Sequence, residues 1–156
     1  MPARGRPPAT PLDHAYRLLA RRAYSEEELR RALLAKGFPE ADVTRTVARL
    51  QDQGYLDDTR LAVALVERLR ARGYGPAGIR ATLARKGLSP DTVEPALEQG
   101  GTDQDVQSAR RFLASRFTAD ALKNLHTRAR AFRLLLRRGY SLEVAESLLG
   151  SSTDDD

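Results

Sequence analysis

Residues 23–50 read AYSEEELRRALLAKGFPEADVTRTVARL, and residues 73–99 read GYGPAGIRATLARKGLSPDTVEPALEQ. The two stretches align without a gap at an offset of 50 positions, which pairs Lys36-Gly37 with Lys86-Gly87. A third copy, residues 131–150, reads AFRLLLRRGYSLEVAESLLG and places Arg138-Gly139 at the same point of the pattern. Self-similarity at a period of about 45–50 residues predicts a helical repeat protein.

Each copy has the signals of three helices. The first helix of each repeat is expected over residues 13–23, 58–72 and 105–116. The second follows a capping signal, such as Ser25 with Glu28 three residues later, and ends at a glycine. The third is expected to open at Pro39, at Ser89-Pro90 and at Ser141, and Pro95 should kink or shorten the second of these helices.

These signals predict an all-α fold of three tandem three-helix repeats, arranged as an elongated, curved array. No segment shows the alternation of apolar and polar residues that is typical of a half-buried strand. The predicted division of the chain is a disordered basic arm (1–11), repeat 1 (12–57), repeat 2 (58–103), repeat 3 (104–150) and an acidic tail (151–156).

The composition of the chain excludes several classes of protein and points to an acidic partner. The chain has 156 residues and a net charge of +5. Because it has no cysteine, it can form neither disulfides nor thiolate metal sites. It contains no apolar stretch long enough to cross a membrane, and its amino terminus is unlike a secretory signal, so we expect a cytoplasmic protein. The charge is uneven: residues 12–58 carry −1, residues 59–103 carry +2, and residues 104–150 carry +5. A basic carboxy-terminal third suits an acidic partner, although solvated helix faces would give the same count.

The aspartate pair in GYLDDTRLA, residues 54–62, admits three interpretations. Asp57 and Asp58 could be an acid–base pair, metal ligands or helix caps. Adjacent side chains diverge along a helix or strand, and a divalent cation needs more oxygen ligands than this stretch offers. Aspartate at a helix entry accepts from free backbone N–H groups and suits the helix dipole, so the pair is interpreted as capping.

Residues 73–78, GYGPAG, match the glycine pattern of dinucleotide-binding loops. That pattern carries the chemistry only between a strand and a helix, and here the preceding residues are helical. The glycines are therefore interpreted as an inter-helix turn. His14 and His126 lie in different repeats outside any metal or nucleophile motif, and nothing in the sequence favours an enzyme or a cofactor.

The chain resembles the RecX family of recombinase regulators. The resemblance rests on the Gly-aromatic-Leu-Asp-Asp run with Arg60 and Ala62, then on Ile79-Arg80, Leu83 and Lys86-Gly87. The block LLLRRGYSLEVAESLL in the third repeat is also similar to that family, so the resemblance spans about Leu12 to Leu149. Two departures are the abundance of small residues from Gly75 to Gly78, and Pro95.

The resemblance implies a cytoplasmic bacterial regulator, a monomer without cofactors, that acts in recombination, DNA repair and the SOS response. Such a protein would bind the RecA recombinase and its filament on single-stranded DNA and mainly inhibit ATP hydrolysis and strand exchange. The rival hypothesis is a basic helical module that binds nucleic acid, single- or double-stranded, without a recombinase. Tyr24, Tyr74 and Tyr140 are interpreted as packing residues rather than as stacking platforms for bases.

The candidate partner-binding surface lies in the third repeat, where residues 121–138 contain no acidic side chain. Arg130, Arg133 and Arg137 share one helix face by their spacing, and Leu125, Ala129, Phe132 and Leu136 are expected on the opposite, buried side. A solvated face is the alternative interpretation. The full candidate set is Arg110, Arg111, Lys123, Arg128, Arg130, Arg133, Arg137 and Arg138.

Overall fold

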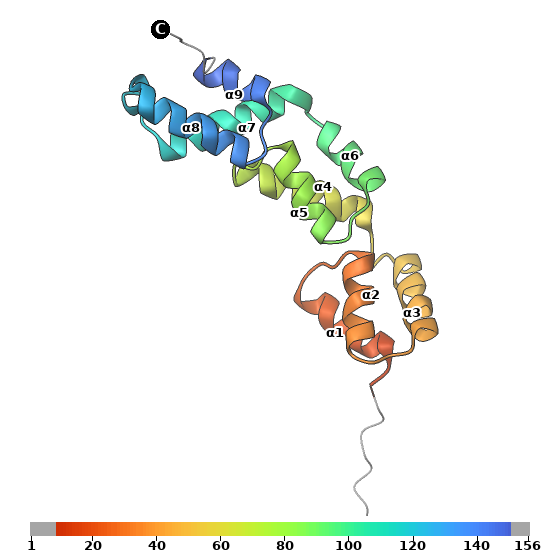
Figure 1. Ribbon diagram of the computed structural model, residues 1–156. Coiled ribbons are helices and arrows are strands. Elements are labelled where there is room, and N and C mark those ends of the chain that lie inside the picture. The colour runs from red at the N-terminus through yellow and green to blue at the C-terminus, as the bar shows by residue number, and fades with distance from the viewer. Residues whose placement is uncertain (1–8, 151–156) are drawn as a thin grey trace, which may run out of the picture. The chain divides into compact units, whose positions relative to one another are not determined.

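The computed structural model describes residues 9–150, and the arm over residues 1–8 and the tail over residues 151–156 lie outside that range. Within the described range the chain forms nine α-helices and one short 3₁₀ helix, with no strand (Figure 1). The helices are α1 (Pro11–Arg21), α2 (Glu26–Ala35), α3 (Glu40–Asp52), α4 (Asp58–Ala71), α5 (Pro76–Arg85), α6 (Pro90–Glu98), α7 (Gly101–Arg116), η1 (Ala121–Lys123), α8 (Leu125–Arg137) and α9 (Leu142–Leu149). The predicted all-α class is confirmed.

The described chain forms two compact units that meet in sequence between Leu61 and Ala62. The first contains α1, α2, α3 and the opening turn of α4, and the second contains the rest of α4 with α5 to α9. The second and third repeats are thus parts of one unit. The repeat boundaries at residues 57 and 103 remain a proposal from the sequence.

The first unit is a three-helix cluster around a small aliphatic core. Its fully or almost fully buried residues are Ala15, Leu29, Leu33, Val43, Leu50 and Leu56. The predicted capping box at Ser25 and Glu28 is present, and the predicted stop at Gly37 has a φ of 98°. The start of α1 was predicted too late: Thr10 caps the helix through a second capping box with Asp13, and Pro11 is its first residue. Residues 10 and 11 therefore belong to the helix and not to the arm.

Asp57 and Asp58 both cap helices, and they cap different ones. Asp57 Oδ1 accepts from the backbone N–H of Arg60 at 3.1 Å and so caps α4, the helix that follows it. Asp58 Oδ1 accepts from the backbone N–H of Glu26 at 3.0 Å, at the first residue of α2. The capping interpretation is confirmed for Asp57 and corrected for Asp58, whose carboxylate joins two helices of the first unit.

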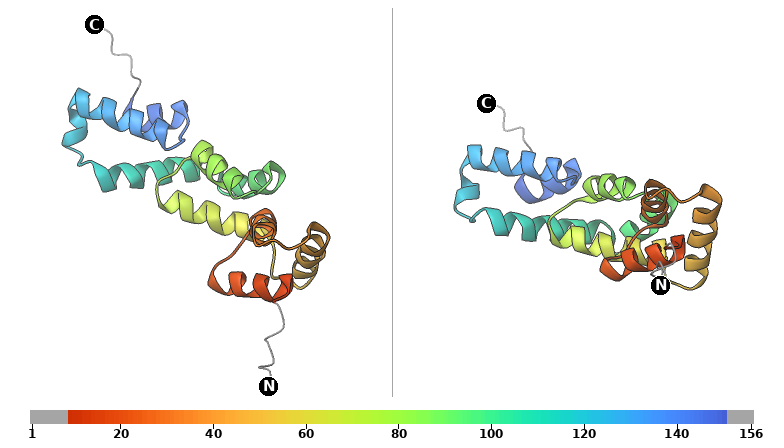
Figure 2. Two further views of the ribbon diagram at one scale, coloured as in Figure 1. Left: turned by 60° about the horizontal axis from the view of Figure 1, so that its bottom comes forward. Right: turned by 90° about the horizontal axis from the view of Figure 1, so that it is seen from below.

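In the second unit, α7, α8 and α9 pack around a shared core that includes Phe112, Leu135 and Tyr140. The helices α7 and α8 lie side by side in both views of Figure 2, joined by η1, and α9 contacts both. Helix α7 begins at Gly101, four residues before its predicted start, because the chain turns at Gly100 with a left-handed φ of 89°. Helix α6 has 9 residues against 13 in α3, and Pro95 lies inside it. That difference agrees with the predicted shortening.

The second and third repeats meet backbone to backbone at two glycine-rich turns. The backbone N–H of Gly75 donates to the carbonyl of Arg138 at 2.8 Å, and that of Ala77 donates to the carbonyl of Gly139 at 3.1 Å. A Cβ atom on Gly75 would lie 2.4 Å from the nitrogen of Tyr140, and one on Gly78 would lie 2.5 Å from the carbonyl oxygen of Arg138. The small residues of GYGPAG, which looked anomalous in the sequence, are therefore required by this contact. The motif is an inter-helix turn, as predicted, and also the place where two repeats dock.

Candidate partner-binding surface

Helix α8 presents a basic stripe to solvent. Arg130, Arg133 and Arg137 are all exposed, and within the described chain none of them has an ion pair or a side-chain hydrogen bond. Their i, i+3, i+7 spacing places them along one side of the helix. Asn124 caps the amino terminus of α8 by accepting from the backbone N–H of Thr127 at 3.1 Å. The cap and the buried side of α8 hold these arginines on a rigid element.

The expected buried side of α8 is wrong for Leu125 and Leu136 and right for Phe132, which packs against the core. The fully buried residues of this helix are Ala131 and Leu135. Leu125 is 69% exposed and Leu136 is 40% exposed, while Ala129 and Phe132 are half-buried. Helix α8 has more apolar residues than one stripe can hold, and Ala131 and Leu135 are the two that become fully buried. Leu125, Ala129, Phe132 and Leu136 form a second stripe beside the arginines, called the outward apolar stripe, which is exposed at Leu125 and Leu136 and half-buried at Ala129 and Phe132.

Other candidate residues contact the protein itself. Lys123 pairs with Asp120 at 3.0 Å on the surface, and Arg128 Nε donates to the carbonyl of Leu122 at 3.2 Å. The guanidinium of Arg138 lies 4.5 Å from the ring centre of Tyr74 and 4.7 Å from that of Phe112. Arg138 thus contributes a cation–π contact to the junction between repeats. Tyr140 is buried, and Tyr24 and Tyr74 are half-buried, as expected of packing residues.

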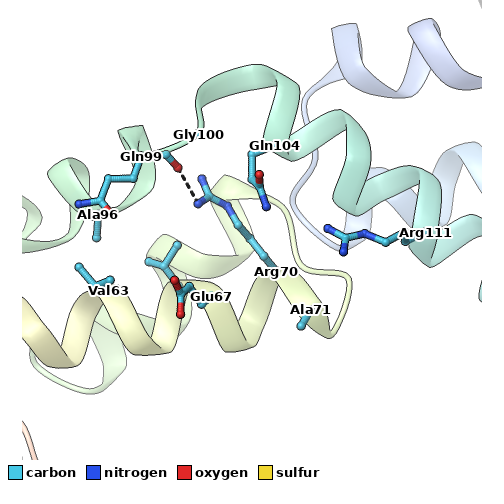
Figure 3. Close-up of a pocket in the computed structure, with 10 residues that line it drawn as sticks. Val63, Glu67, Arg70, Ala71, Ala96, Gln99, Gly100, Gln104 and Arg111 are labelled. Atoms are coloured by element: carbon cyan, nitrogen blue, oxygen red, sulfur yellow. Dashed lines mark hydrogen bonds between the residues drawn. The ribbon is translucent and has the colours of Figure 1, made fainter.

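Arg110 and Arg111 lie on α7, and Arg111 faces a separate cavity. This cavity has a volume of about 440 Å³ and is lined by residues of α4, α6, α7 and the α6–α7 turn, with none from α8. Figure 3 shows Arg70 rising from α4 toward Gly100, with Gln104 beside it and Arg111 further along α7. Arg111 is therefore not part of the basic stripe, although the sequence grouped them.

Sequence reasoning missed Arg70, the buried cation in the wall of this cavity. Only 7% exposed, Arg70 donates to the carbonyl oxygens of Leu97 at 2.6 Å and Gln99 at 3.0 Å, at the end of α6. Its guanidinium also lies 3.6 Å from the carboxylate of Asp105. Burial raises the pKa of Asp105, and the nearby charges of Arg70 and Arg80 oppose that rise. The one signal in the sequence was the position of Arg70, which continues the i, i+4 spacing of Ala62 and Val66. The contacts of Arg70 with the end of α6 and with Asp105 hold α4, α6 and α7 together.

Two further classes of site were sought in the described part of the chain. No group of histidine and acidic side chains there could hold a metal ion. No helix within residues 9–150 is long and apolar enough to cross a membrane. The exposed basic and apolar stripes of α8 are thus the principal candidate site.

The architecture places the chain among all-helical proteins built from tandem three-helix domains. Residues 12–50 match the family model for the first three-helix domain of RecX, and residues 57–97 match that for the second. The chain belongs to the RecX family.

Relatives and solved structures agree with this assignment. The chain is 40% identical over 141 residues to "Regulatory protein RecX" of Xanthomonas axonopodis pv. citri, which covers 89% of this chain and 86% of the relative. It is also 40% identical over 134 residues to the protein of the same name from Thermus thermophilus, covering 86% of each chain. The crystal structure of RecX from Lactobacillus salivarius shares the fold, with a TM-score of 0.74 and 17% identity over 91% of this chain and 94% of that one. The relatives are named as regulators.

Proposed function

We propose that this protein is a non-catalytic regulator of a RecA-type recombinase. It binds the recombinase and its filament on single-stranded DNA, and it mainly inhibits ATP hydrolysis and strand exchange. Membership of a family whose relatives are named regulatory proteins supports this role. A cytoplasmic, monomeric protein without a cofactor would suit that partner.

We place the binding surface on the third repeat. The observation that carries this placement is the basic stripe of α8: three exposed arginines without an ionic partner in the described chain, on a segment with no acidic residue from 121 to 138. A guanidinium can bind a carboxylate or a phosphate through two parallel hydrogen bonds, so the stripe suits an acidic protein surface or a nucleoprotein filament. The remaining candidates, Arg110, Arg111, Lys123, Arg128 and Arg138, would act as secondary contacts.

The test is a charge reversal with a matched control. Changing Arg130, Arg133 and Arg137 to glutamate should weaken filament binding at least about tenfold, because each reversal replaces an attraction of at least about 0.2 kcal/mol by a comparable repulsion, which is about 1.2 kcal/mol or more for the three. The readouts are the affinity for a RecA filament on single-stranded DNA and the inhibition of its ATPase. The loss should shrink as salt is raised.

The control reverses three exposed arginines of the first unit, Arg17, Arg21 and Arg49. Arg49 is preferred to Arg45, because Arg45 forms an ion pair with Asp42 and its reversal would disturb the first unit. If the control weakens inhibition as much as the α8 reversal does, the overall charge acts and the stripe is not the binding surface.

The second candidate is a nucleic-acid-binding module that acts without a recombinase, and the same arginine excess favours it. Binding to single- and double-stranded DNA should be measured with and without recombinase at moderate salt. Tight DNA binding that recombinase does not change would favour this alternative over the proposed function.

A further inference from the structure

The outward apolar stripe of α8 has the spacing of a helix–helix seam. Leu125, Ala129, Phe132 and Leu136 are separated by four, three and four residues. This alternation keeps side chains on one line of a helix and is the spacing through which two helices interlock. The stripe runs from residue 125 to residue 136, a separation of eleven positions or about 17 Å of helix, which is three turns.

The exposure of Leu125 and Leu136, at the two ends of this stripe, is not explained by packing within the second unit. The buried side of α8 is already formed by Ala131 and Leu135, and Phe132 is the member of the stripe that also packs against the core. Leu125 at 69% and Leu136 at 40% are two of the five large apolar side chains that are exposed in the described chain. Apolar side chains grouped beside a charged stripe, rather than scattered singly, are typical of a protein–protein contact.

The neighbouring charges define the chemistry of the occupant. Arg133 directly flanks the seam, and Arg130 and Arg137 lie one step further round the helix. In paired helices, charges that flank the seam select a partner of opposite charge. A second copy of this chain would bring the same basic stripe against its own, so self-association is disfavoured. A phosphate backbone would satisfy the arginines and leave the leucines uncovered.

We propose that the outward face of α8 docks an acidic amphipathic helix of the protein partner. The partner helix would place apolar side chains on the stripe of Leu125, Ala129, Phe132 and Leu136, and its flanking carboxylates on the arginines. This inference rests on the proposed function for the identity of the partner, and it adds that the contact is made by protein rather than by DNA. Leu125 and Leu136 would be the apolar anchors, and the arginines would select for acidic sequence and accelerate association.

The experiment uses the full chain with two variants, both of which replace exposed leucines by serine. One carries Leu125→Ser and Leu136→Ser. The other, Leu34→Ser, changes a leucine of α2 that is 37% exposed and therefore matches Leu136. Each is titrated with three probes: a RecA filament on single-stranded DNA, a short DNA duplex, and a glutamate-rich amphipathic peptide of about 20 residues, long enough to form a helix on binding. A peptide of the same composition in shuffled order, without an apolar face, is the negative probe.

The proposal expects the double leucine variant to bind both the filament and the amphipathic peptide at least about tenfold more weakly than the wild type. Unlike the loss caused by arginine reversal, this loss should persist at high salt, because apolar contacts are not screened. Leu34→Ser should change neither affinity, and DNA binding should be the same in all three proteins. Circular dichroism of each variant checks that helix content is kept.

Several results would overturn the proposal. Undiminished binding of the filament by the double leucine variant would show that the stripe is not a contact, while the proposed function would stand. A wild type that binds no filament would remove the proposed function, and the peptide titration would still decide the inference. Equal affinity for the ordered and the shuffled peptide, a parallel loss of DNA binding, or self-association of the wild type that the leucine variant abolishes would each assign the face to another role.

Discussion

The backbone contact between the second and third repeats predicts an unusually costly glycine-to-alanine substitution. A Cβ atom on Gly139 would lie 2.1 Å from the nitrogen and 2.8 Å from the Cα of Gly78. Relieving that overlap requires the two turns to separate by more than about 1 Å. Such a movement takes both bridging hydrogen bonds, now 2.8 and 3.1 Å long, out of hydrogen-bonding range.

The expected loss of stability in Gly139→Ala is the sum of the lost hydrogen bonds and the backbone strain. Two backbone hydrogen bonds are worth about 0.5–1.5 kcal/mol each. Gly139 also has a φ of 92°, where an alanine costs about 1–2 kcal/mol more than a glycine. Gly139→Ala should therefore lower the free energy of unfolding of the second unit by about 2–5 kcal/mol.

Gly37 is the matched control, because it closes the equivalent helix of the first repeat. Its φ is 98°, and a Cβ atom there would have no neighbour within 4 Å. Gly37→Ala should cost only the backbone term of about 1–2 kcal/mol. Gly78→Ala tests the steric term by itself: alanine normally favours a helix over glycine by about 1 kcal/mol, and here the substitution should destabilise instead. Its Cβ would lie 2.5 Å from the carbonyl oxygen of Arg138.

Two-state unfolding is not assumed for a chain with two compact units, so the assay has to be local. Urea denaturation followed by circular dichroism gives the overall stability, and hydrogen exchange by NMR at the amides of Gly75 and Ala77 reports the contact directly. Faster exchange at these two amides is expected in Gly139→Ala and not in Gly37→Ala. The reasoning is refuted if Gly139→Ala costs no more than Gly37→Ala, or if both amides stay protected.

The remaining predictions concern charged side chains that cap helices or are buried between them. Asp57→Ala should lower stability by about 0.5–2 kcal/mol through loss of a helix cap, seen as a lower urea midpoint. Burial, together with the charge of Asp57, raises the pKa of Asp58 above its ordinary value of 3.8, so its contribution to stability falls as pH rises from 3.8 through the higher pKa of the folded protein. Asp58→Asn, which can still accept from Glu26, should remove that part of the pH dependence in denaturation curves recorded across the acid range. Arg70→Met should destabilise the second unit by about 3–5 kcal/mol, because it removes the nearest cation from the largely buried carboxylate of Asp105 and the donor from the carbonyls of Leu97 and Gln99. Adding Asp105→Asn should recover part of the loss.

Much of the fold could be predicted because its signals are local. The capping box at Ser25 and Glu28 and the glycine at position 37 are properties of short stretches, and both describe the structure correctly. The start of α7 was not predicted, because α7 begins directly after the left-handed Gly100, whereas the left-handed Gly54 precedes the start of α4 by four residues. Local signals predict helices, and irregular turns between repeats shift their ends.

The candidate site was predicted in part. The exposure of Arg130, Arg133 and Arg137 agrees with their spacing, since long charged side chains face solvent unless they are paired. Leu125 and Leu136 were assigned to the core because α8 has two apolar stripes, and periodicity does not say which one a neighbouring helix covers. The buried position of Arg70 was missed for a related reason: its partners are the backbone carbonyls of Leu97 and Gln99, which have no signature in the sequence.

The glycine contact also limits how the protein can change. Most packing defects can be suppressed by a second substitution, since trimming a neighbouring side chain makes room for a larger one. At Gly139 the obstructing atoms are the backbone nitrogen and Cα of Gly78, which every amino acid has. We therefore expect no single side-chain substitution elsewhere to restore the backbone contact in Gly139→Ala. Suppressors that restore protection of the Gly75 and Ala77 amides should be revertants, or changes in loop length that move one turn away from the other.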